Sequence, residues 1–192
     1  GSEMCIRDSF DAVLTVDGAY KAADFINFCD AYDIPVLSLT NVKGYAADVR
    51  SEKSIAKAVA KLTYAFANAN VPKVNVITGE AYGSAYVTMN SKALGADVTY
   101  AWPDASIGMM DANEAAKIMY ADDIAKSADV QSVISEKAAE YAALQSGVES
   151  AAARGYVDTI INPEDTRKYV AAAFEMLYTK REDRPDKKHG TV

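Results

Sequence analysis

The sequence has little of what side-chain catalysis usually requires. It contains one histidine, His189, and two cysteines, Cys5 and Cys29, and these residues do not have the spacing of metal ligands. A nucleophile that pairs with histidine would depend on His189 alone, in a charged C-terminal stretch. We therefore expect neither a metal site nor side-chain nucleophilic catalysis. Cys29 is expected to pack as a small apolar residue, and no disulfide is expected.

Positive charge and long apolar runs are also scarce. The 20 lysine and arginine residues are outnumbered by 27 aspartate and glutamate residues, which gives a formal net charge of −7. A nucleic-acid-binding surface needs a basic face, so no nucleic acid partner is expected. No run approaches the ~18 apolar residues of a membrane span, and the N-terminus lacks the apolar core of a signal peptide. The chain is expected to be soluble and cytoplasmic.

The composition predicts one domain. Half of the 192 residues are hydrophobic, which is enough for one substantial core. Residues 1–9 show neither strand alternation nor helical periodicity, and we interpret them as a tag or another non-native segment. The domain is expected to span residues 10–192.

Strand-like and helix-like segments alternate along this domain. Strands are predicted at residues 12–16, 35–42, 74–77, 97–102 and 156–161, with a strand or sheet edge at 106–110. Helices are predicted at residues 19–32, 51–68, 86–93, 113–120, 130–144, 149–153 and 162–178, with Ser51 as a candidate N-cap. This alternation predicts an α/β domain with mostly parallel strands.

The most informative stretch runs from Val74 to Asp97. A β-branched strand is followed by a segment of small residues and then by a helix-compatible segment; the small residues are Gly79, Ala81, Gly83, Ser84 and Ala85. A strand, a tight turn and a helix start present free backbone N–H groups, to which the helix dipole adds about half a positive charge. Such a turn can hold a developing oxyanion. The small residues could equally serve close packing of helix on sheet. Ser84 lacks the G-x-S-x-G context of a nucleophile.

Four segments of this chain resemble one family. The central one is VPKVNVITGEAYGSAYVTMNSKALGADVTYAWPDASIG; FINFCDAYDIPVLSL precedes it, and AAARGYVDTIINPEDTRKYV and KREDRPDKKHG follow it. They are similar to carboxyltransferase subunits of biotin-dependent acyl-CoA carboxylases and decarboxylases, in the crotonase-like superfamily. The resemblance covers roughly residues 10–192 and only the C-terminal one of the two halves of such a subunit. It implies an α/β fold with a crotonase-like ββα spiral core and flanking helices.

The resemblance also implies a reaction and its partners. A carboxyl group would move between N1 of carboxybiotin, held on a biotin carboxyl carrier protein, and the α-carbon of an acyl-CoA. An enolate and a ureido oxyanion would be held in turn by backbone amides. The implied active site needs an N-terminal carboxyltransferase half for the CoA and an oligomer, a trimer or hexamer. In the decarboxylase branch a membrane decarboxylase subunit would be a further partner. No metal is implied.

The family's biotin-side oxyanion hole uses two backbone amides at the G-A step of an A-Y-G-G-A-Y motif. In AYGSAY this step falls on Ser84 and Ala85, which the resemblance implies are the catalytic residues. Amide donation from Ser84 requires a negative φ, which a helix N-terminal turn allows. Tyr82, Gly83 and Tyr86 flank the hole and are implied to bind biotin or substrate. Core packing of these tyrosines is the alternative.

Two departures from the family bear on specificity. Val87 stands where the family has an aspartate associated with the choice of acyl-CoA. The family's D-V-P-G-F loop is NVKGY here, in which Gly44 and Tyr45 are implied to line the biotin side. Lys43 of this loop could meet an anion such as carboxybiotin, or it could simply be an exposed lysine.

These departures, together with the absent half, leave a second hypothesis open. The chain could be a catalytically incomplete module that serves assembly or docks a biotin carrier. A stand-alone crotonase-like hydratase or isomerase fits less well, because no positioned pair of carboxylates is found for acid and base work. The sequence specifies neither the acyl-CoA nor the direction of transfer.

Overall fold

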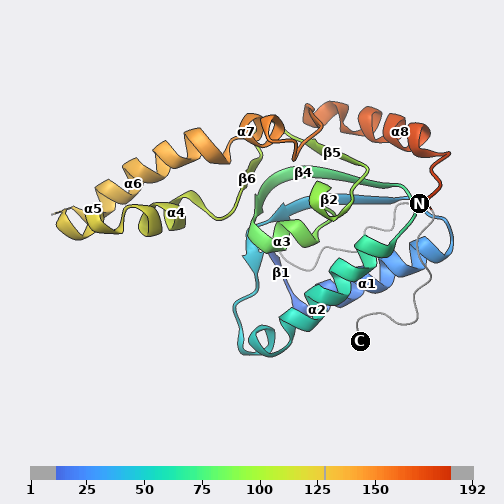
Figure 1. The fold of residues 1–192 in the computed structure, drawn as a ribbon, viewed down its shortest axis with the longest axis horizontal. Coiled ribbons are helices and arrows are strands. Elements are labelled where there is room, and N and C mark those ends of the chain that lie inside the picture. Colours follow the sequence, from blue (N-terminus) through green and yellow to red (C-terminus); the bar gives the residue numbers. More distant parts are fainter. Residues whose placement is uncertain (1–11, 128, 183–192) are drawn as a thin grey trace.

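The centre of the protein is a parallel β-sheet with helices on both faces (Figure 1). A computed structural model describes residues 12–127 and 129–182. In this part of the chain the sheet consists of β2 (Val36–Val42), β4 (Lys73–Tyr82), β5 (Val98–Ala101), β6 (Ser106–Gly108) and β7 (Thr159–Ile160). The order is β2-β4-β5-β7, and β6 pairs with the last residues of β4. These pairs are all parallel, which confirms the predicted α/β class.

Strand β4 is much longer than predicted. It continues through Gly79, which we expected to end the strand near residue 77, to Tyr82. The Asn41 side chain accepts a hydrogen bond from the Glu80 N–H at 3.0 Å, and β6 pairs with residues 80–82. A Cβ at position 79 would lie 2.7 Å from Asn41 Oδ1, so glycine permits this approach. The prediction was wrong because the groups that extend the strand come from distant segments.

The N-terminal region begins with a very short strand and a long helix. β1 (Val13–Leu14) pairs with β3 (Gly44–Tyr45) in a separate two-stranded sheet. Helix α1 (Val16–Ala31) follows directly, because the Thr15 side chain accepts a hydrogen bond from the Gly18 N–H at 3.1 Å and caps the helix. The predicted strand at 12–16 is therefore shorter, and the helix begins three residues earlier than predicted.

Helix α2 (Val49–Asn68) lies beside α1. Its N-cap is Asp48, whose carboxylate accepts from the N–H groups of Arg50 and Ser51, both at 2.8 Å. Ser51 was the predicted cap. It is instead buried inside the first turn and donates its hydroxyl to Asp48 at 2.9 Å.

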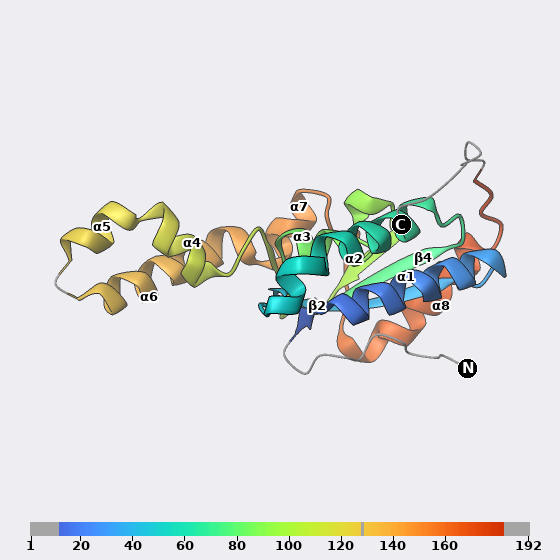
Figure 2. The same ribbon diagram turned by 90° about the horizontal axis from the view of Figure 1, so that it is seen from below.

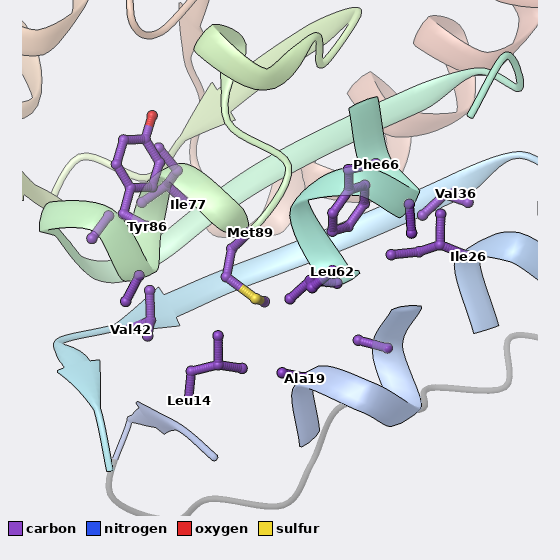
Figure 3. Close-up of a cluster of buried hydrophobic side chains, with 14 of the residues drawn as sticks. Leu14, Ala19, Ile26, Val36, Val42, Leu62, Phe66, Ile77, Tyr86 and Met89 are labelled. Carbon is purple, nitrogen blue, oxygen red and sulfur yellow. The ribbon is translucent and has the colours of Figure 1, made fainter. Parts of the chain in front are cut away.

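Helices α1 and α2 cover one face of the sheet, and the main core lies between them and the strands (Figure 3). Ile26 of α1 and Leu62 and Phe66 of α2 are at most 1% exposed and pack in the same cluster as Ile77 of β4. Cys29 is 2% exposed and belongs to this cluster, as predicted.

Helix α8 (Thr166–Leu177) covers the other face of β4 and β5 (Figure 2). It follows a 3-10 turn, η3 (Pro163–Asp165), with Asn162 as N-cap and proline at the first position, as predicted. A second cluster forms under α8, composed of Val74, Val76, Tyr100, Ile161, Val170 and Ala173.

A helical arm projects from the sheet between β6 and β7 (Figures 1 and 2). It consists of α4 (Ala112–Met119), α5 (Ala121–Lys126), α6 (Val130–Tyr141), a π-helical turn η2 (Ala142–Ser146) and α7 (Val148–Ala153). Helices α4 and α6 pack on each other. The predicted helix at 130–144 thus changes to π-helical geometry after Tyr141. Gly155, with φ +80°, follows α7, as expected of a helix end.

The remaining differences from the predicted elements concern short segments. The helix predicted at 86–93 is α3 (Gly83–Thr88), which is followed by the 3-10 turn η1 (Lys92–Leu94). The last strand, β7, has two residues instead of the predicted six. In the described ranges, none of the helices is both long and apolar enough to cross a membrane. The predicted non-native segment, Cys5 and His189 lie outside the described residues.

We predict that Leu62→Ala destabilises the domain by about 2–5 kcal/mol, because a fully buried leucine leaves a cavity when it is truncated. Leu144→Ala is the matched control, since Leu144 is 67% exposed, and it should change stability by less than about 0.5 kcal/mol. Urea unfolding of both variants measures the two values. Equal losses would contradict the assignment of the core.

Candidate functional site

The predicted site residues meet at one edge of the sheet. Because β2, β4 and β6 are parallel, their carboxyl ends lie at the same edge, where α/β proteins usually bind ligands. Lys43 and β3 follow β2, helix α3 follows β4, and Met109 follows β6. Helix α3 also packs against β3, so Gly44 and Tyr45 lie next to the helix.

A sharp turn at Gly83 joins β4 to α3. Gly83 has φ +59°, a left-handed conformation that favours glycine. A Cβ at this position would also lie 3.0 Å from the main-chain oxygen of Met109. Glycine is thus needed at position 83 both for the backbone conformation and for the approach of β6.

The first turn of α3 presents backbone N–H groups. The N-cap residue, Tyr82, makes no side-chain capping hydrogen bond. Neither the Ser84 N–H nor the Ala85 N–H donates a hydrogen bond to any atom of the described ranges. Ser84 is exposed and is not among the residues with positive φ, so serine in place of a second glycine keeps its amide available. Ala85 is 1% exposed.

The two flanking tyrosines are buried, as the packing alternative predicted. Tyr82 and Tyr86 are each 7% exposed. Burial raises the pKa of Tyr82, and the Ser106 side chain partly opposes this shift. Burial also raises the pKa of Tyr86 to about 12, with a smaller contribution from Tyr156. Figure 3 shows the Tyr86 hydroxyl directed away from the core cluster. Both tyrosines therefore stay protonated at neutral pH, and a protonated hydroxyl can donate a hydrogen bond.

Lys43 forms an ion pair across the edge of the site. Its Nζ lies 3.0 Å from Glu80 Oε2, and the lysine and glutamate side chains are 56% and 34% exposed. The hydrogen bond and the charge of Glu80 raise the pKa of Lys43, with a smaller contribution from Asp111. Lys43 is thus exposed, and its charge is already matched by a carboxylate. In the described part of the chain, no three His, Cys, Asp or Glu side chains gather as a metal site would require.

Several contacts of the site could not be found in the sequence. The approach of Met109 to Gly83, the Lys43–Glu80 pair and the position of Ser106 near Tyr82 all depend on β6 and β2 ending beside β4. No motif marks these residues, because they are far apart in sequence or have no recognisable spacing. Val87 lies on α3 and is 39% exposed, at the outer side of the site.

We predict that Gly83→Ala destabilises the domain by about 1–2 kcal/mol or more, because alanine is strained at this φ and its Cβ would crowd the Met109 oxygen. Gly44→Ala is the control, since no atom lies within 4 Å of a Cβ at position 44. Chemical denaturation should show at most a small change for Gly44→Ala. A Gly83→Ala variant as stable as the parent would contradict the turn geometry.

We also predict a stability difference at alkaline pH between the parent and Tyr86→Phe. The folded-state pKa of Tyr86, about 12, is above the unfolded value near 10, so its contribution is fully present below pH 10 and is lost between pH 10 and 12. The parent should lose about 1.4 kcal/mol per pH unit more than Tyr86→Phe in this interval. Urea unfolding at pH 9 and pH 11 measures the difference. Parallel curves would show that Tyr86 titrates normally.

Sequence comparisons match the whole described region to one family. Residues 9–192 match the carboxyl transferase domain. The chain is 50% identical over 180 residues to a putative propionyl-CoA carboxylase beta chain of Bacillus subtilis, covering 93% of this chain and 36% of the relative. It is 43% identical over 178 residues to the methylmalonyl-CoA carboxyltransferase 12S subunit of Propionibacterium freudenreichii subsp. shermanii, covering 92% and 34%. The chain thus spans about a third of the length of these relatives.

The solved structures most similar in fold include carboxyltransferase subunits of the same kind. The transcarboxylase 12S subunit superposes with a TM-score of 0.88 at 42% identity, covering 93% of this chain and 34% of that chain. That structure contains methylmalonyl-CoA and methylmalonic acid and is described as a hexamer assembly in a multienzyme core. The beta subunit of geranyl-CoA carboxylase from P. aeruginosa has a TM-score of 0.79 at 27% identity, with 94% and 35% covered. These neighbours confirm the predicted crotonase-like fold. The chain belongs to the carboxyl transferase domain family.

Proposed function

We propose that this chain forms the biotin-side half of a carboxyltransferase site that moves a carboxyl group between carboxybiotin and the α-carbon of an acyl-CoA. The observation that carries the proposal is the pair of Ser84 and Ala85 amides, which have no partner in the described ranges and begin a helix at the carboxyl edge of the sheet. Membership of the carboxyl transferase domain family supports the reaction class.

The two amides suit the charge that develops in this reaction. When the N–C bond of carboxybiotin breaks, negative charge collects on the ureido oxygen, and the new C–C bond forms at the α-carbon of the acyl-CoA. The ureido anion takes up the proton that the α-carbon loses. Backbone N–H groups can stabilise such an oxygen without being titrated, and one donor of this kind typically contributes about 10²–10³-fold in rate.

The surrounding side chains fit this task. The buried hydroxyls of Tyr82 and Tyr86 stay protonated and cannot compete with biotin as anions. Gly44 and Tyr45 of β3 pack beside α3 and would line the biotin side, and Val87 would face the substrate from the outer side of α3. The Lys43–Glu80 pair leaves little net charge at this edge, which suits a neutral ureido ring.

A complete site would require further polypeptide. Leu37 and Leu39 of edge strand β2 are 43% and 46% exposed, and the arm exposes Ile118 and Met119 at 67% and 59%. Apolar surface of this kind is usually covered in an assembly. The N-terminal carboxyltransferase half, a biotin carrier protein and other copies of the subunit are the partners that we propose. The related 12S subunit is itself described as a hexamer.

A second candidate is a module that docks the biotin carrier or helps assembly without catalysis. Two observations favour it. Lys43 already forms an ion pair with Glu80, and Val87 stands where the family has an acidic residue. Titration with a biotinyl carrier domain would show binding under either function. Carboxyl exchange between methylmalonyl-CoA and biotin is expected only of the enzyme.

We predict that Ser84→Pro, tested in a complex with the N-terminal half, lowers carboxyl exchange between methylmalonyl-CoA and free biotin by about 100-fold or more. Proline removes one of the two N–H donors. The helix itself loses no hydrogen bond, because N–H groups in the first turn have no acceptor within the helix. Labelled carboxyl transfer measures the rate.

Ser84→Ala is the matched control, because it removes the hydroxyl and keeps the amide. It should retain nearly all activity. Far-UV circular dichroism and thermal unfolding show whether both variants remain folded. Full exchange activity in a folded Ser84→Pro complex would refute the oxyanion role.

A further inference from the structure

A row of buried polar side chains crosses the sheet behind α3. Thr40 on β2, Asn75 on β4 and Thr99 on β5 are each 0% exposed. Asn75 and Thr99 pair in register, and the Thr40 hydroxyl donates to Asn75 Oδ1 at 2.7 Å. Burying polar groups in a core is costly unless they are hydrogen-bonded, so this row calls for an explanation.

Thr40 connects the row to the end of α3. Its single hydroxyl hydrogen is shared in a three-centre hydrogen bond, mainly with Asn75 Oδ1 and more weakly, at 3.3 Å, with the carbonyl oxygen of Met89, the residue that ends the helix. The next residue, Asn90, has φ +59° and donates from Nδ2 to the Val74 carbonyl on β4 at 3.4 Å. The C-terminal end of α3 is thus attached by side chains to both β2 and β4.

Two atoms of the row are buried without a protein partner. Asn75 Nδ2 and Thr99 Oγ1 have no hydrogen-bond partner among the residues described. Because their residues are paired on strands about 4.8 Å apart, both side chains face the same side of the sheet. One water molecule can accept from Nδ2 and donate to Oγ1 at about 2.9 Å each.

We propose that Thr99, one buried water, Asn75 and Thr40 form a continuous hydrogen-bonded support for α3, and that Thr40 is a positioning residue for the amides at the other end of this helix. A helix of six residues has little stability of its own, so its placement depends on such attachments. The positioning role rests on the proposed carboxyl transfer, whereas the water site does not.

Thr99→Val tests the water site, because valine keeps the shape and removes the hydroxyl. If a water bridges Thr99 and Asn75, the variant loses a hydrogen bond and its Tm falls by about 2–4 °C. If the hydroxyl has no partner, its removal relieves a cost and the Tm stays or rises, which would overturn the water site. A crystal structure of the parent at high resolution should show the water between the two side chains.

Thr40→Val tests the positioning role. In the complex with the N-terminal half, kcat for exchange from methylmalonyl-CoA to biotin should fall about tenfold or more, with KM for biotin nearly unchanged, because Thr40 does not touch biotin. Thr40→Ser should restore most of the rate. Thr78→Val is the matched control: Thr78 donates to the Thr40 carbonyl at 3.3 Å and makes no bond to α3.

Hydrogen exchange separates this proposal from the proposed function. In Thr40→Val the amides of residues 86–88, which lie beyond the unbonded first turn of α3, should exchange about tenfold faster, whether or not the complex is active. Unchanged exchange in α3 would overturn the support. If the parent complex shows no carboxyl exchange, the proposed function fails, while the Tm and hydrogen-exchange results still decide the network.

Discussion

The passage of β4 into α3 at Gly83 is the constraint on which the candidate site depends. A strand can turn directly into a helix here only because glycine adopts φ +59° and lacks the Cβ that would collide with the Met109 oxygen. Once the turn is formed, the first turn of α3 begins at the edge where three parallel strands end. β6 pairs with residues 80–82 of β4 directly before this turn, so the turn lies beside the end of β6.

The electrostatics of this edge agree with a chain that is acidic overall and poor in histidine. Under the proposed function, a developing negative charge would be stabilised there by backbone dipoles, whose partial charges do not titrate. The nearest cation, Lys43, is paired with Glu80, and the buried tyrosines keep their protons. Such donors suit the proposed ureido oxygen, because the charge on this oxygen grows during the reaction and preorganised dipoles then stabilise the transition state more than the ground state.

The short helix that carries these amides is attached to the sheet at its C-terminal end. Thr40, Asn75 and Asn90 connect its far end to β2 and β4. Hydrogen bonds between polar groups in a core are directional, so they can fix the orientation of a helix of only six residues. The arm and the exposed side of β2 have the opposite character, because they present apolar side chains that the described residues leave uncovered.

Local patterns in the chain are enough to indicate the class of fold and to select a candidate site. Alternating strand and helix segments predicted a parallel α/β domain, and AYGSAY marked the turn, because strand alternation, proline and glycine act over a few residues. Boundaries were less predictable: β4 runs past Gly79 since Asn41 and β6 supply its partners, and Asp48, not Ser51, caps α2. No local sequence pattern predicts the Met109 contact, the Lys43–Glu80 pair or the row of buried polar side chains at Thr40. They exist because folding brings strand ends and strand interiors from distant segments within a few ångströms of each other, and only packing in three dimensions sets those distances.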